Sequence, residues 1–355
     1  MPVSIVVGGQ FGSEGKGKVA LELVRQFSRS SVMTVVRVGG PNSGHTAFDR
    51  AGKKWALRQM PAACIDKNVD VVFPAGSYVD PELLLKEIEQ LDYPHDRIFI
   101  SKHARVVTKE HRDWERSAGI TKSIGSTGSG VGAAVLAAIA REASNFPLAS
   151  PSAGKHDLLR PFTCDVGEFL DARLSRNERV IVEGTQGFGL SLLDGGFWPQ
   201  ATARCTTAAG ALAEAGLSPR DVDDVTLVLR SYPIRVAGES GPLTGELTWE
   251  EVGRRTGKTG LEEFTTVTQK LRRVGEFDGD LVRKAIKANK PDRVVLNHMD
   301  YVGDQKELSH RKSPVRNFLD ARVSEIGPVH WLGFSPSGVI ENPIGNRLFA
   351  GGVRS

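Results

Sequence analysis

The chain has 355 residues, of which 40% are hydrophobic and 25% charged, as expected for a globular protein with a substantial core. Its 46 Lys and Arg residues are interleaved with 42 Asp and Glu residues, so no nucleic-acid-binding tail or stripe is indicated. The three cysteines lack metal-like spacing, and no apolar run could span a membrane. We expect a cytoplasmic protein that binds neither nucleic acid nor a membrane.

Short β-branched runs alternate with segments of helical periodicity along the whole chain. This alternation predicts an α/β fold with a large, mainly parallel twisted sheet flanked by helices on both faces. Strands are predicted at 3–8, 34–38, 69–73, 97–100, 179–183, 225–229 and 293–297, and helices at 16–27, 81–91, 131–143, 207–215 and 279–288. The looser segments 145–157 and 306–314 are predicted to be loops within a single domain covering residues 1–355.

Residues 9–18, between the first predicted strand and the first predicted helix, have the composition of a phosphate-binding loop. Glycines let backbone N–H groups approach phosphate oxygens, the helix adds the positive end of its dipole, and Lys16 and Lys18 add charge. The spacing nearly matches the P-loop, but Val19 stands where a Mg²⁺-binding Ser or Thr would be. Many glycine-rich turns are purely structural, but this position between a strand and a helix favours phosphate binding.

A second glycine-rich segment, 39–46, places His45 just after the second predicted strand. Taken alone, such a histidine is more often a hydrogen-bonded surface residue than a catalytic one. Ligands of open α/β sheets bind at the carboxyl ends of the strands. His45 and the loop at 9–18 are therefore expected to face one crevice.

Four motifs, in this order, resemble those of adenylosuccinate synthetases: GSEGKGK at 12–18, NSGHT at 42–46, GSTGSG at 125–130 and EGTQG at 183–187. The resemblance extends from residue 3 to about 300 and more weakly to 337. Relative to the family the chain looks shorter, with reduced insertions around 142–180 and 300–330. The resemblance implies a Mg²⁺-dependent carbon–nitrogen ligase that phosphorylates O6 of a purine nucleotide and then joins aspartate to C6.

The resemblance also implies roles for single positions. The catalytic set would be Ser13, Lys16, His45 and Gln186, with Lys16 holding phosphates and His45 as the acid near the γ-phosphate and O6. The substrate nucleotide would contact Ser13, Asn42, Ser126, Thr127, Arg141, Gln186, Leu190, Thr202 and Val236. The donor nucleotide would contact Gly12, Glu14, Gly15, Lys16, Gly17, Thr46, Asn297, His298, Asp300 and Ser335. The metal would be held by Ser13 and Gly44.

The resemblance assigns Arg141 and Thr127 to the binding of the 5′-phosphate of the substrate nucleotide. Thr127 matches the family's contact to this phosphate, and Arg141 matches an arginine that reaches the phosphate site of the neighbouring subunit. The resemblance therefore implies a homodimer. Without it, Arg141 would be interpreted as a solvated charge on a helix.

The basic segment 265–275 resembles the family's aspartate-binding loop. Arginines suit a dicarboxylate because each guanidinium can hold one carboxylate through two hydrogen bonds. Thr268, Arg272 and Arg273 keep the family pattern and are predicted to bind L-aspartate, whereas Lys270 and Leu271 depart from it. Without the resemblance, a solvated loop would be the simpler interpretation.

Ser13 replaces the family's aspartate, whose carboxylate takes the N1 proton of inosinate. A serine hydroxyl is no base at neutral pH, but it leaves room for the 2-amino group of guanine and can accept a hydrogen bond from it. This pattern is similar to the phage-encoded branch of the family, which converts dGMP and aspartate to N6-succino-2-amino-2′-deoxyadenylate for 2-aminoadenine nucleotide synthesis. We therefore predict dGMP as the substrate, and the host cytoplasm as the location of a phage-encoded enzyme.

His298 replaces the lysine of the family's Lys-x-Asp motif, whose stem covers the guanine of GTP, while Asp300 is retained. This change predicts ATP or dATP as the donor. The first alternative is an ordinary adenylosuccinate synthetase that uses IMP, aspartate and GTP. The others are a nucleotide-binding switch protein, which would leave His45 and the arginines without a role, and a catalytically inactive paralogue.

Overall fold

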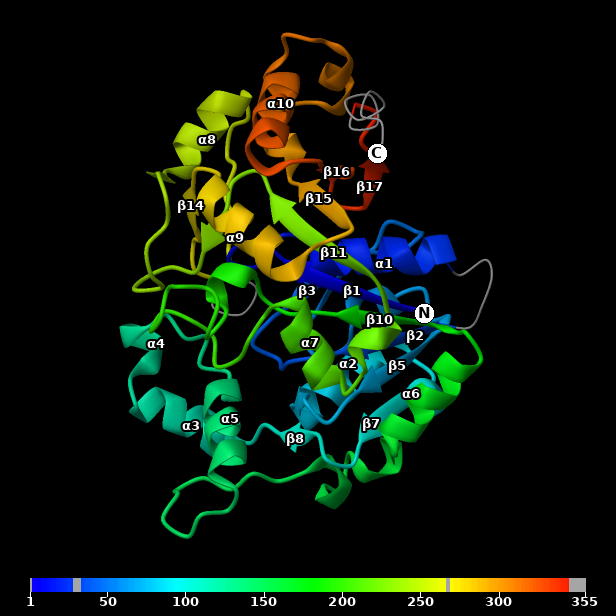
Figure 1. The fold of residues 1–355 in the computed structure, drawn as a ribbon. Helices are drawn as coiled ribbons and strands as arrows, with labels where there is room; N and C mark the ends of the chain where they lie inside the picture. The colour runs from blue at the N-terminus through cyan, green and yellow to red at the C-terminus, as the bar shows by residue number, and fades with distance from the viewer. Residues whose placement is uncertain (1, 28–32, 266–268, 345–355) are drawn as a thin grey trace.

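The computed structural model (Figure 1) describes residues 2–27, 33–265 and 269–344. Ten strands form one sheet in the order β17-β16-β15-β11-β1-β10-β2-β5-β7-β9. In the described chain every neighbouring pair of this sheet is parallel except β16 and β17. The predicted α/β class, with a large and mainly parallel sheet, is confirmed.

The strands of the large sheet are β1 (Val3–Gly8), β2 (Met33–Arg37), β5 (Val69–Phe73), β7 (Ile98–Ser101), β9 (Thr163–Cys164), β10 (Arg179–Glu183), β11 (Val222–Arg230), β15 (Arg293–Asn297), β16 (Trp331–Ser335) and β17 (Gly338–Glu341). Short strands pair separately: β3 (His45–Phe48) with β4 (Lys54–Leu57), β6 (Tyr78–Val79) with β8 (Arg105–Val106), and β14 (Arg273–Gly275) with both β12 (Ile234–Arg235) and β13 (Glu246–Leu247).

The helices are α1 (Lys16–Phe27), α2 (Pro81–Leu91), α3 (Lys109–Ser117), α4 (Ile120–Ser123), α5 (Val131–Ala140), α6 (Val166–Ser175), α7 (Ala208–Ala215), α8 (Trp249–Thr256), α9 (Gly279–Asn289) and α10 (Pro314–Ile326). Figure 1 shows α3, α4 and α5 grouped together to one side of the sheet. No helix in the described part of the chain is long and apolar enough to cross a membrane.

Helices cover both faces of the sheet because the central strands are apolar on both sides. β1 is buried along its whole length, and its alternate side chains enter different cores. Ile5 and Val7 pack in the core that contains α7 and α9, whereas Val6 packs in the core that contains α1 and α2. A parallel strand buried on both faces needs such a continuous apolar run.

The prediction was less accurate at several boundaries. The predicted helix 131–143 ends at Ala140, and Arg141 adopts a left-handed conformation with φ of 52°. The predicted loop 306–314 is wrong in part, since it contains a 3-10 helix, Gln305–Ser309, and the first residue of α10. Ser313 caps α10 by accepting the N–H of Arg316, and Pro314 occupies its first turn, which are ordinary helix-start signals.

The sheet register brings several polar side chains to one edge of the molecule. Glu183 pairs with Arg37, and Arg230 pairs with Asn297, each at the last residue of its strand. β1 lies between these pairs and ends at Gly8, where the glycine-rich loop begins. The loops after five parallel strands therefore meet at the carboxyl edge, as expected for a ligand site in an open α/β sheet.

Gly17 sets the distance between α1 and His45. A Cβ atom at this position would lie 2.6 Å from Ala62 Cβ and 2.8 Å from His45 Cβ. Both distances are shorter than a van der Waals contact. The first turn of α1 can therefore lie against His45 only because residue 17 has no side chain.

We expect Gly17→Ala to lower the free energy of unfolding by about 1–3 kcal/mol, because overlap with Ala62 and His45 outweighs the better helix propensity of alanine. Thermal unfolding measures the change. Gly167→Ala in α6 is the control: its Cβ would meet only an Asp165 oxygen at 3.3 Å, and we expect it to be neutral or stabilising by up to about 1 kcal/mol. An unfolding temperature unchanged by Gly17→Ala would contradict the close approach.

Candidate active site

The N–H groups of the glycine-rich loop bind a carboxylate from the loop itself, that of Glu14. Glu14 Oε1 accepts from the backbone N–H groups of Gln10 at 3.1 Å and Gly12 at 2.8 Å. Glu14 Oε2 lies 2.7 Å from Lys16 Nζ, and both side chains are buried. The carboxylate thus occupies backbone N–H groups and an ammonium group that the sequence analysis predicted would bind phosphate. A phosphate group at this loop must compete with Glu14 or displace it.

The two lysines of the loop point to different partners. Lys16 pairs with Glu14, whereas Lys18 Nζ donates to the carbonyl oxygen of Ser335 at 2.8 Å. Burial lowers the pKa of Lys18 to about 8, and the nearby Asp300 opposes this shift. Lys18 therefore belongs with the predicted donor-nucleotide residues, a role that the sequence analysis did not give it.

His45, Glu183 and Arg37 form a buried cluster below the second glycine-rich loop. His45 Nδ1 lies 2.5 Å from Glu183 Oε1, and Arg37 Nη1 lies 3.1 Å from the same oxygen. The carboxylate also accepts the N–H groups of Ala62 and Ala63, each at 3.1 Å. Because a carboxylate can only accept, the Nδ1–H of His45 donates to it. Arg37 Nη1 lies 2.8 Å from Nδ1 and 3.4 Å from Nε2, so Nε2 is the ring nitrogen left for a ligand.

The charges of this cluster follow from burial and from these partners. Burial first, and then Arg37, lowers the pKa of His45 to about 4, although Glu183 opposes the shift. Burial alone would raise the pKa of Glu183, but His45 and Arg37 bring it to about 2. His45 is therefore neutral at neutral pH, and an anionic ligand near Nε2 would favour its protonation. Sequence analysis missed Arg37 and Glu183 as site residues, although Glu183 opens the EGTQG motif.

Ser13 lies between two arginines. It is exposed and has a φ of 57°. Its carbonyl oxygen accepts from Arg230 Nη1 at 3.2 Å, and its hydroxyl is hydrogen-bonded to Arg272 Nη1. The structure thus brings a predicted substrate residue next to a predicted aspartate residue 259 positions away.

Arg230 anchors this part of the site from within the protein. Its guanidinium is fully buried and forms an ion pair with Glu263, whose Oε1 also accepts from the hydroxyl of Tyr301 at 2.8 Å. Burial would raise the pKa of Glu263, but Arg230 and then His298 bring it to about 2. The pair is therefore charged. The sequence analysis did not single out either residue, because no motif marks a pair 33 residues apart.

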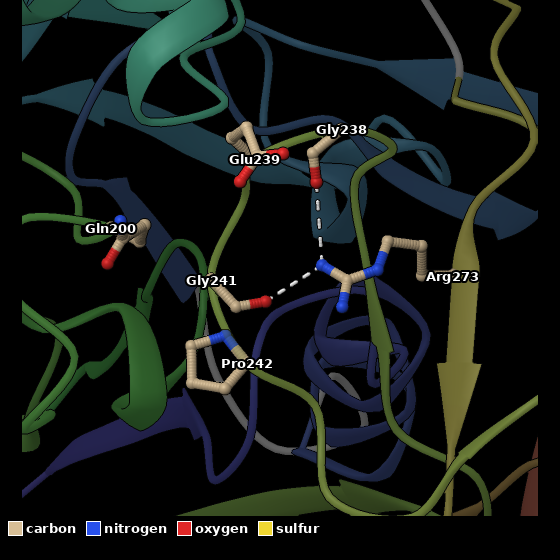
Figure 2. Close-up of a pocket in the computed structure, with 6 residues that line it drawn as sticks. All are labelled: Gln200, Gly238, Glu239, Gly241, Pro242 and Arg273. Atoms are coloured by element: carbon tan, nitrogen blue, oxygen red, sulfur yellow. Dashed lines mark hydrogen bonds between the residues drawn. The ribbon is translucent and has the colours of Figure 1, made fainter.

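Arg273 and Arg272 face different surroundings. Figure 2 shows Arg273 in a pocket of about 490 Å³, where its guanidinium donates to the carbonyl oxygens of Gly241 at 2.8 Å and Gly238 at 3.5 Å. It also pairs with Glu246 at 2.5 Å. Arg273 is thus held by protein oxygens at the pocket wall, whereas Arg272 reaches Ser13. The third predicted aspartate residue, Thr268, lies outside the described residues.

Two predicted substrate residues carry buried polar atoms that could bind a ligand. Among the described residues, Asn42 Oδ1 and Gln186 Oε1 are buried without a hydrogen bond. Their loops touch, since the backbone N–H of Gln186 donates to the Ser43 hydroxyl at 3.4 Å. A polar ligand between the loops would satisfy both atoms, because buried polar groups are nearly always paired.

The other predicted substrate residues are dispersed among loops. Thr202 N–H donates to the carbonyl of Leu190 at 2.8 Å, which holds these two residues side by side. The Thr127 hydroxyl donates to that of Ser129 at 3.0 Å, and the Ser126 hydroxyl accepts from Gly128 N–H at 3.3 Å. The Val236 carbonyl accepts from the Ser240 hydroxyl at 2.5 Å. Arg141 is exposed at the end of α5.

The donor side of the site gathers at the end of β15. Asn297 is buried and donates from Nδ2 to the Glu14 carbonyl at 2.8 Å, which ties β15 to the glycine-rich loop. His298 has a φ of 58°, and its ring lies 5.3 Å from that of Tyr301. Burial, followed by Arg230, lowers the pKa of His298 to about 3, so its imidazole is neutral. The sequence motifs at 12–18 and 297–300 thus share one edge of the sheet.

A metal ion would find few protein ligands here. Within the described ranges, no three His, Cys, Asp or Glu side chains converge to hold one. The predicted ligands Ser13 and Gly44 are both exposed, and they offer a hydroxyl and a backbone carbonyl. Hard oxygen donors suit Mg²⁺, which commonly completes its coordination with phosphate oxygens and water. Both predicted ligands offer oxygen donors of the kind that Mg²⁺ accepts, and the Ser13 hydroxyl is at present hydrogen-bonded to Arg272.

Comparison with known proteins agrees with this geometry. The sequence profile described as adenylosuccinate synthetase matches residues 5–147 and 149–310. The adenylosuccinate synthetase of Methanococcus aeolicus is 38% identical over 304 residues, which cover 84% of this chain and 85% of that protein. The N6-succino-2-amino-2′-deoxyadenylate synthase of Vibrio phage phiVC8 is 34% identical over 346 residues, which cover 94% of this chain and 96% of that protein.

Solved structures give the same result. The cyanophage S-2L succinoaminodeoxyadenylate synthetase, bound to dGMP and to dATP as an energy donor, matches with a TM-score of 0.80 and 28% identity over 98% of this chain and 97% of its own. The adenylosuccinate synthetase of Plasmodium falciparum shares the fold, with a TM-score of 0.79 and 21% identity over 96% of this chain and all of its own. The fold and the site thus define a purine-nucleotide carbon–nitrogen ligase. The chain belongs to the adenylosuccinate synthetase family.

We expect Glu183→Gln to lower kcat for aspartate-dependent phosphate release at least about tenfold, because the neutral amide no longer stabilises a protonated His45. Glu183 raises the pKa of His45, so its loss should move the alkaline limb of the pH–rate profile to lower pH. Because Arg37 loses its buried partner, the variant should be less stable, so the profile is recorded well below the unfolding temperature. The shift should vanish in a His45→Asn background, and superimposable profiles would contradict the positioning role of Glu183.

Lys18→Met should stabilise the protein at neutral pH by up to about 3 kcal/mol, since one pKa unit corresponds to about 1.4 kcal/mol. The native pKa of about 8 lies below the ordinary 10.5. Between these values the unfolded wild-type chain still holds a proton that the native protein has lost. Wild-type stability therefore rises with pH in this window, and the advantage of the variant shrinks. Denaturant unfolding at pH 7 and pH 10, with the exposed Lys284→Met as control, tests this. If the difference in unfolding free energy between variant and wild type is the same at both pH values, Lys18 does not carry a destabilising buried charge.

Proposed function

We propose that this protein is a Mg²⁺-dependent ligase that joins L-aspartate to C6 of dGMP, with ATP or dATP as the phosphoryl donor. The product would be N6-succino-2-amino-2′-deoxyadenylate, an intermediate in 2-aminoadenine nucleotide synthesis. The observation that carries this proposal is the neutral, exposed Ser13 between Arg230 and Arg272. The phage relatives with the corresponding names support it, because they cover nearly the whole chain.

Ser13 distinguishes guanine from hypoxanthine at the C2 edge of the base. Guanine carries a 2-amino group there, and hypoxanthine carries only hydrogen. A hydroxyl is small enough to leave room for this group and can accept one of its hydrogen bonds. A site that hydrogen-bonds a substrate group discriminates strongly against the analogue without it, since its own polar atom is then left unpaired.

The first step would transfer the γ-phosphoryl group of the donor to O6 of dGMP: the bond to the β–γ bridging oxygen breaks, the nucleoside diphosphate leaves, and the N1 proton passes to water or to a phosphate oxygen. Lys16 would leave Glu14 to hold phosphate oxygens, and His45 would direct Nε2 toward the transferred group while Glu183 holds Nδ1–H. Such residues act mainly by positioning and by neutralising charge. Bound Mg²⁺, with Ser13 and Gly44 as its protein ligands, would neutralise phosphate charge.

In the second step the amino group of aspartate would attack C6, and the C6–O bond to the phosphorylated oxygen would break, so that inorganic phosphate leaves. Phosphorylation turns O6 from a poor leaving group into a good one. Arg272 would hold an aspartate carboxylate close to the base; its guanidinium next to Ser13 supports this role. Asn42 and Gln186 carry the unpaired oxygens that would accept from ligand N–H groups.

The proposal includes a homodimer in which Arg141 reaches the phosphate site of the second copy. Arg141 is exposed at the end of α5, and the same helix carries the exposed apolar side chains Leu136 and Ile139. These side chains are 44% and 69% exposed. An exposed apolar helix face next to an exposed arginine is the composition expected where two copies meet.

An ordinary adenylosuccinate synthetase, acting on IMP with GTP, is the second candidate. It is favoured by the 38% identity to the Methanococcus aeolicus protein of that name. The two candidates differ in the acceptor base. Phosphate release with Mg²⁺, ATP or GTP, and aspartate separates them when dGMP, GMP and IMP are compared and the mass of each product is determined.

We expect turnover and the succino adduct with dGMP, and we expect Ser13→Asp to lower kcat/KM for dGMP by about 100-fold and to raise it for IMP. Asp tolerates the left-handed backbone of residue 13, so the fold should persist. The control is Ser324→Asp, an exposed serine of α10, which adds the same charge far from the loop. Turnover of the wild-type protein with IMP alone would refute the dGMP assignment.

A further inference from the structure

Arg204 is a buried arginine that connects two segments of the candidate site. Its Nη2 donates to the Thr185 hydroxyl at 2.9 Å, and its Nη1 pairs with Glu214 Oε2 of α7 at 2.6 Å. Its backbone is fixed as well, because the Leu192 N–H donates to the Arg204 carbonyl at 3.0 Å. The side chain of Arg204 is 7% exposed. Sequence analysis gave Arg204 no role, and the proposed mechanism does not use it.

The first of the two segments meets Arg204 at Gly39. This glycine has a φ of 87°, and a Cβ there would lie 2.5 Å from Arg204 Nη2 and 2.6 Å from Thr185 Oγ1. Both side chains therefore lie against the backbone of the glycine-rich segment 39–46. Burial raises the pKa of Glu214, while Arg204 and then the Gly39 N–H oppose this shift. The Arg204–Glu214 pair thus lies directly against the start of this segment.

The second segment carries Thr185, the residue before Gln186 in the EGTQG motif. Gln186 has a φ of 60°, a left-handed conformation that a non-glycine residue keeps only when its surroundings hold it. Its Oε1 and Asn42 Oδ1 are buried without a hydrogen bond among the described residues. Asn42 lies three residues after Gly39. Each segment that Arg204 contacts therefore carries one of the two oxygens that a ligand would satisfy.

Two contacts hold these segments together. The Gln186 N–H donates to the Ser43 hydroxyl at 3.4 Å, which is long for a hydrogen bond. The other contact is Arg204, which donates to Thr185 at 2.9 Å and lies against Gly39. Hydrogen bonds from a charged donor are roughly twice as strong as neutral ones. Arg204 therefore provides the stronger of the two links.

We propose that Arg204 is a positioning residue for the substrate nucleotide. It sets the separation of the two segments, and with it the separation of the Asn42 and Gln186 side chains that the ligand must span. Arg204 acts through Thr185 and Gly39 and does not itself hold the ligand. This inference rests on the proposed function in that dGMP is the nucleotide between the segments.

The first test is Thr185→Val, which removes the hydroxyl that accepts from Arg204, nearly keeps the shape of the side chain and leaves the pair with Glu214 in place. We expect the dissociation constant of dGMP, measured by calorimetry, to rise at least about fivefold, because the segments are no longer held at the spacing that the ligand needs. The dissociation constant of ATP should stay within about twofold. Thr185→Ser keeps a hydroxyl and should bind dGMP as the wild type does.

Arg204→Met tests whether the two residues act as one link. It should raise the dissociation constant of dGMP by at least as much as Thr185→Val, and the double variant should be no worse than Arg204→Met alone. The matched control is Arg173→Met. Arg173 pairs with Asp70 at 2.5 Å at the amino end of β5, so its loss should lower the unfolding temperature and leave dGMP binding unchanged.

The outcomes separate this inference from the proposed function. Equal dGMP affinity in the wild type and Thr185→Val overturns the inference, and so do additive losses in the double variant. A merely structural network would lower only the unfolding temperature. If the wild type binds IMP and not dGMP, the proposed function fails, and the same series with IMP decides the role of Arg204. A wild type that binds neither nucleotide overturns both.

Discussion

The buried carboxylate of Glu183 is the interaction on which the rest of the site depends. It lies at the end of β10 and joins four parts of the chain, because it binds Arg37 of β2, His45 of β3, and the N–H groups of Ala62 and Ala63. A buried charge is tolerated only when partners replace the water it has lost. Here every partner is a donor, and the Nδ1–H of His45, the acid of the proposed mechanism, is one of them. Loss of the carboxylate would remove the ion-pair partner of the buried Arg37, whose Nη2 would keep the carbonyl oxygens of Ser43 and Arg58, and it would remove the hydrogen bond that orients His45.

A second buried ion pair, between Arg230 and Glu263, lies on the other side of β1. Glu183 ends β10 and Arg230 ends β11, so the glycine-rich loop at the end of β1 is flanked by a buried anion and a buried cation. The anion orients His45, which the proposed mechanism directs toward the reacting oxygen, whereas the cation fixes the Ser13 carbonyl beside Arg272. The order of the parallel sheet therefore places opposite charges at the ends of the two strands that flank β1. In the proposed mechanism each charge holds a different part of the site.

The periodicity of the sequence was sufficient to predict the class of fold, because seven buried strands contain continuous apolar runs that no helix face requires. It was insufficient for the short strands β12, β13 and β14, whose two or three residues have no measurable period. For the site, glycine spacing located the loops and the resemblance located Ser13, His45 and Arg272. Arg37, Glu183 and Glu263 were missed for a common reason. Each is defined by a partner far away in the chain, and only strand register and loop packing bring these partners together.

The change from a carboxylate to Ser13 has consequences beyond the base. In the described part of the loop region, Lys16 pairs with Glu14, and Arg230 pairs with Glu263. The hydrogen bonds of the Arg272 guanidinium go instead to a hydroxyl and a backbone carbonyl. A carboxylate at residue 13 would form an ion pair with Arg272, so its charge would be felt at the proposed aspartate site as well as at the base. The neutral hydroxyl leaves this charge available to the incoming dicarboxylate, and it leaves the C2 edge of the purine uncrowded. If the proposed roles hold, a single substitution alters the choice of base and the binding of aspartate together, because Ser13 and Arg272 are in direct contact.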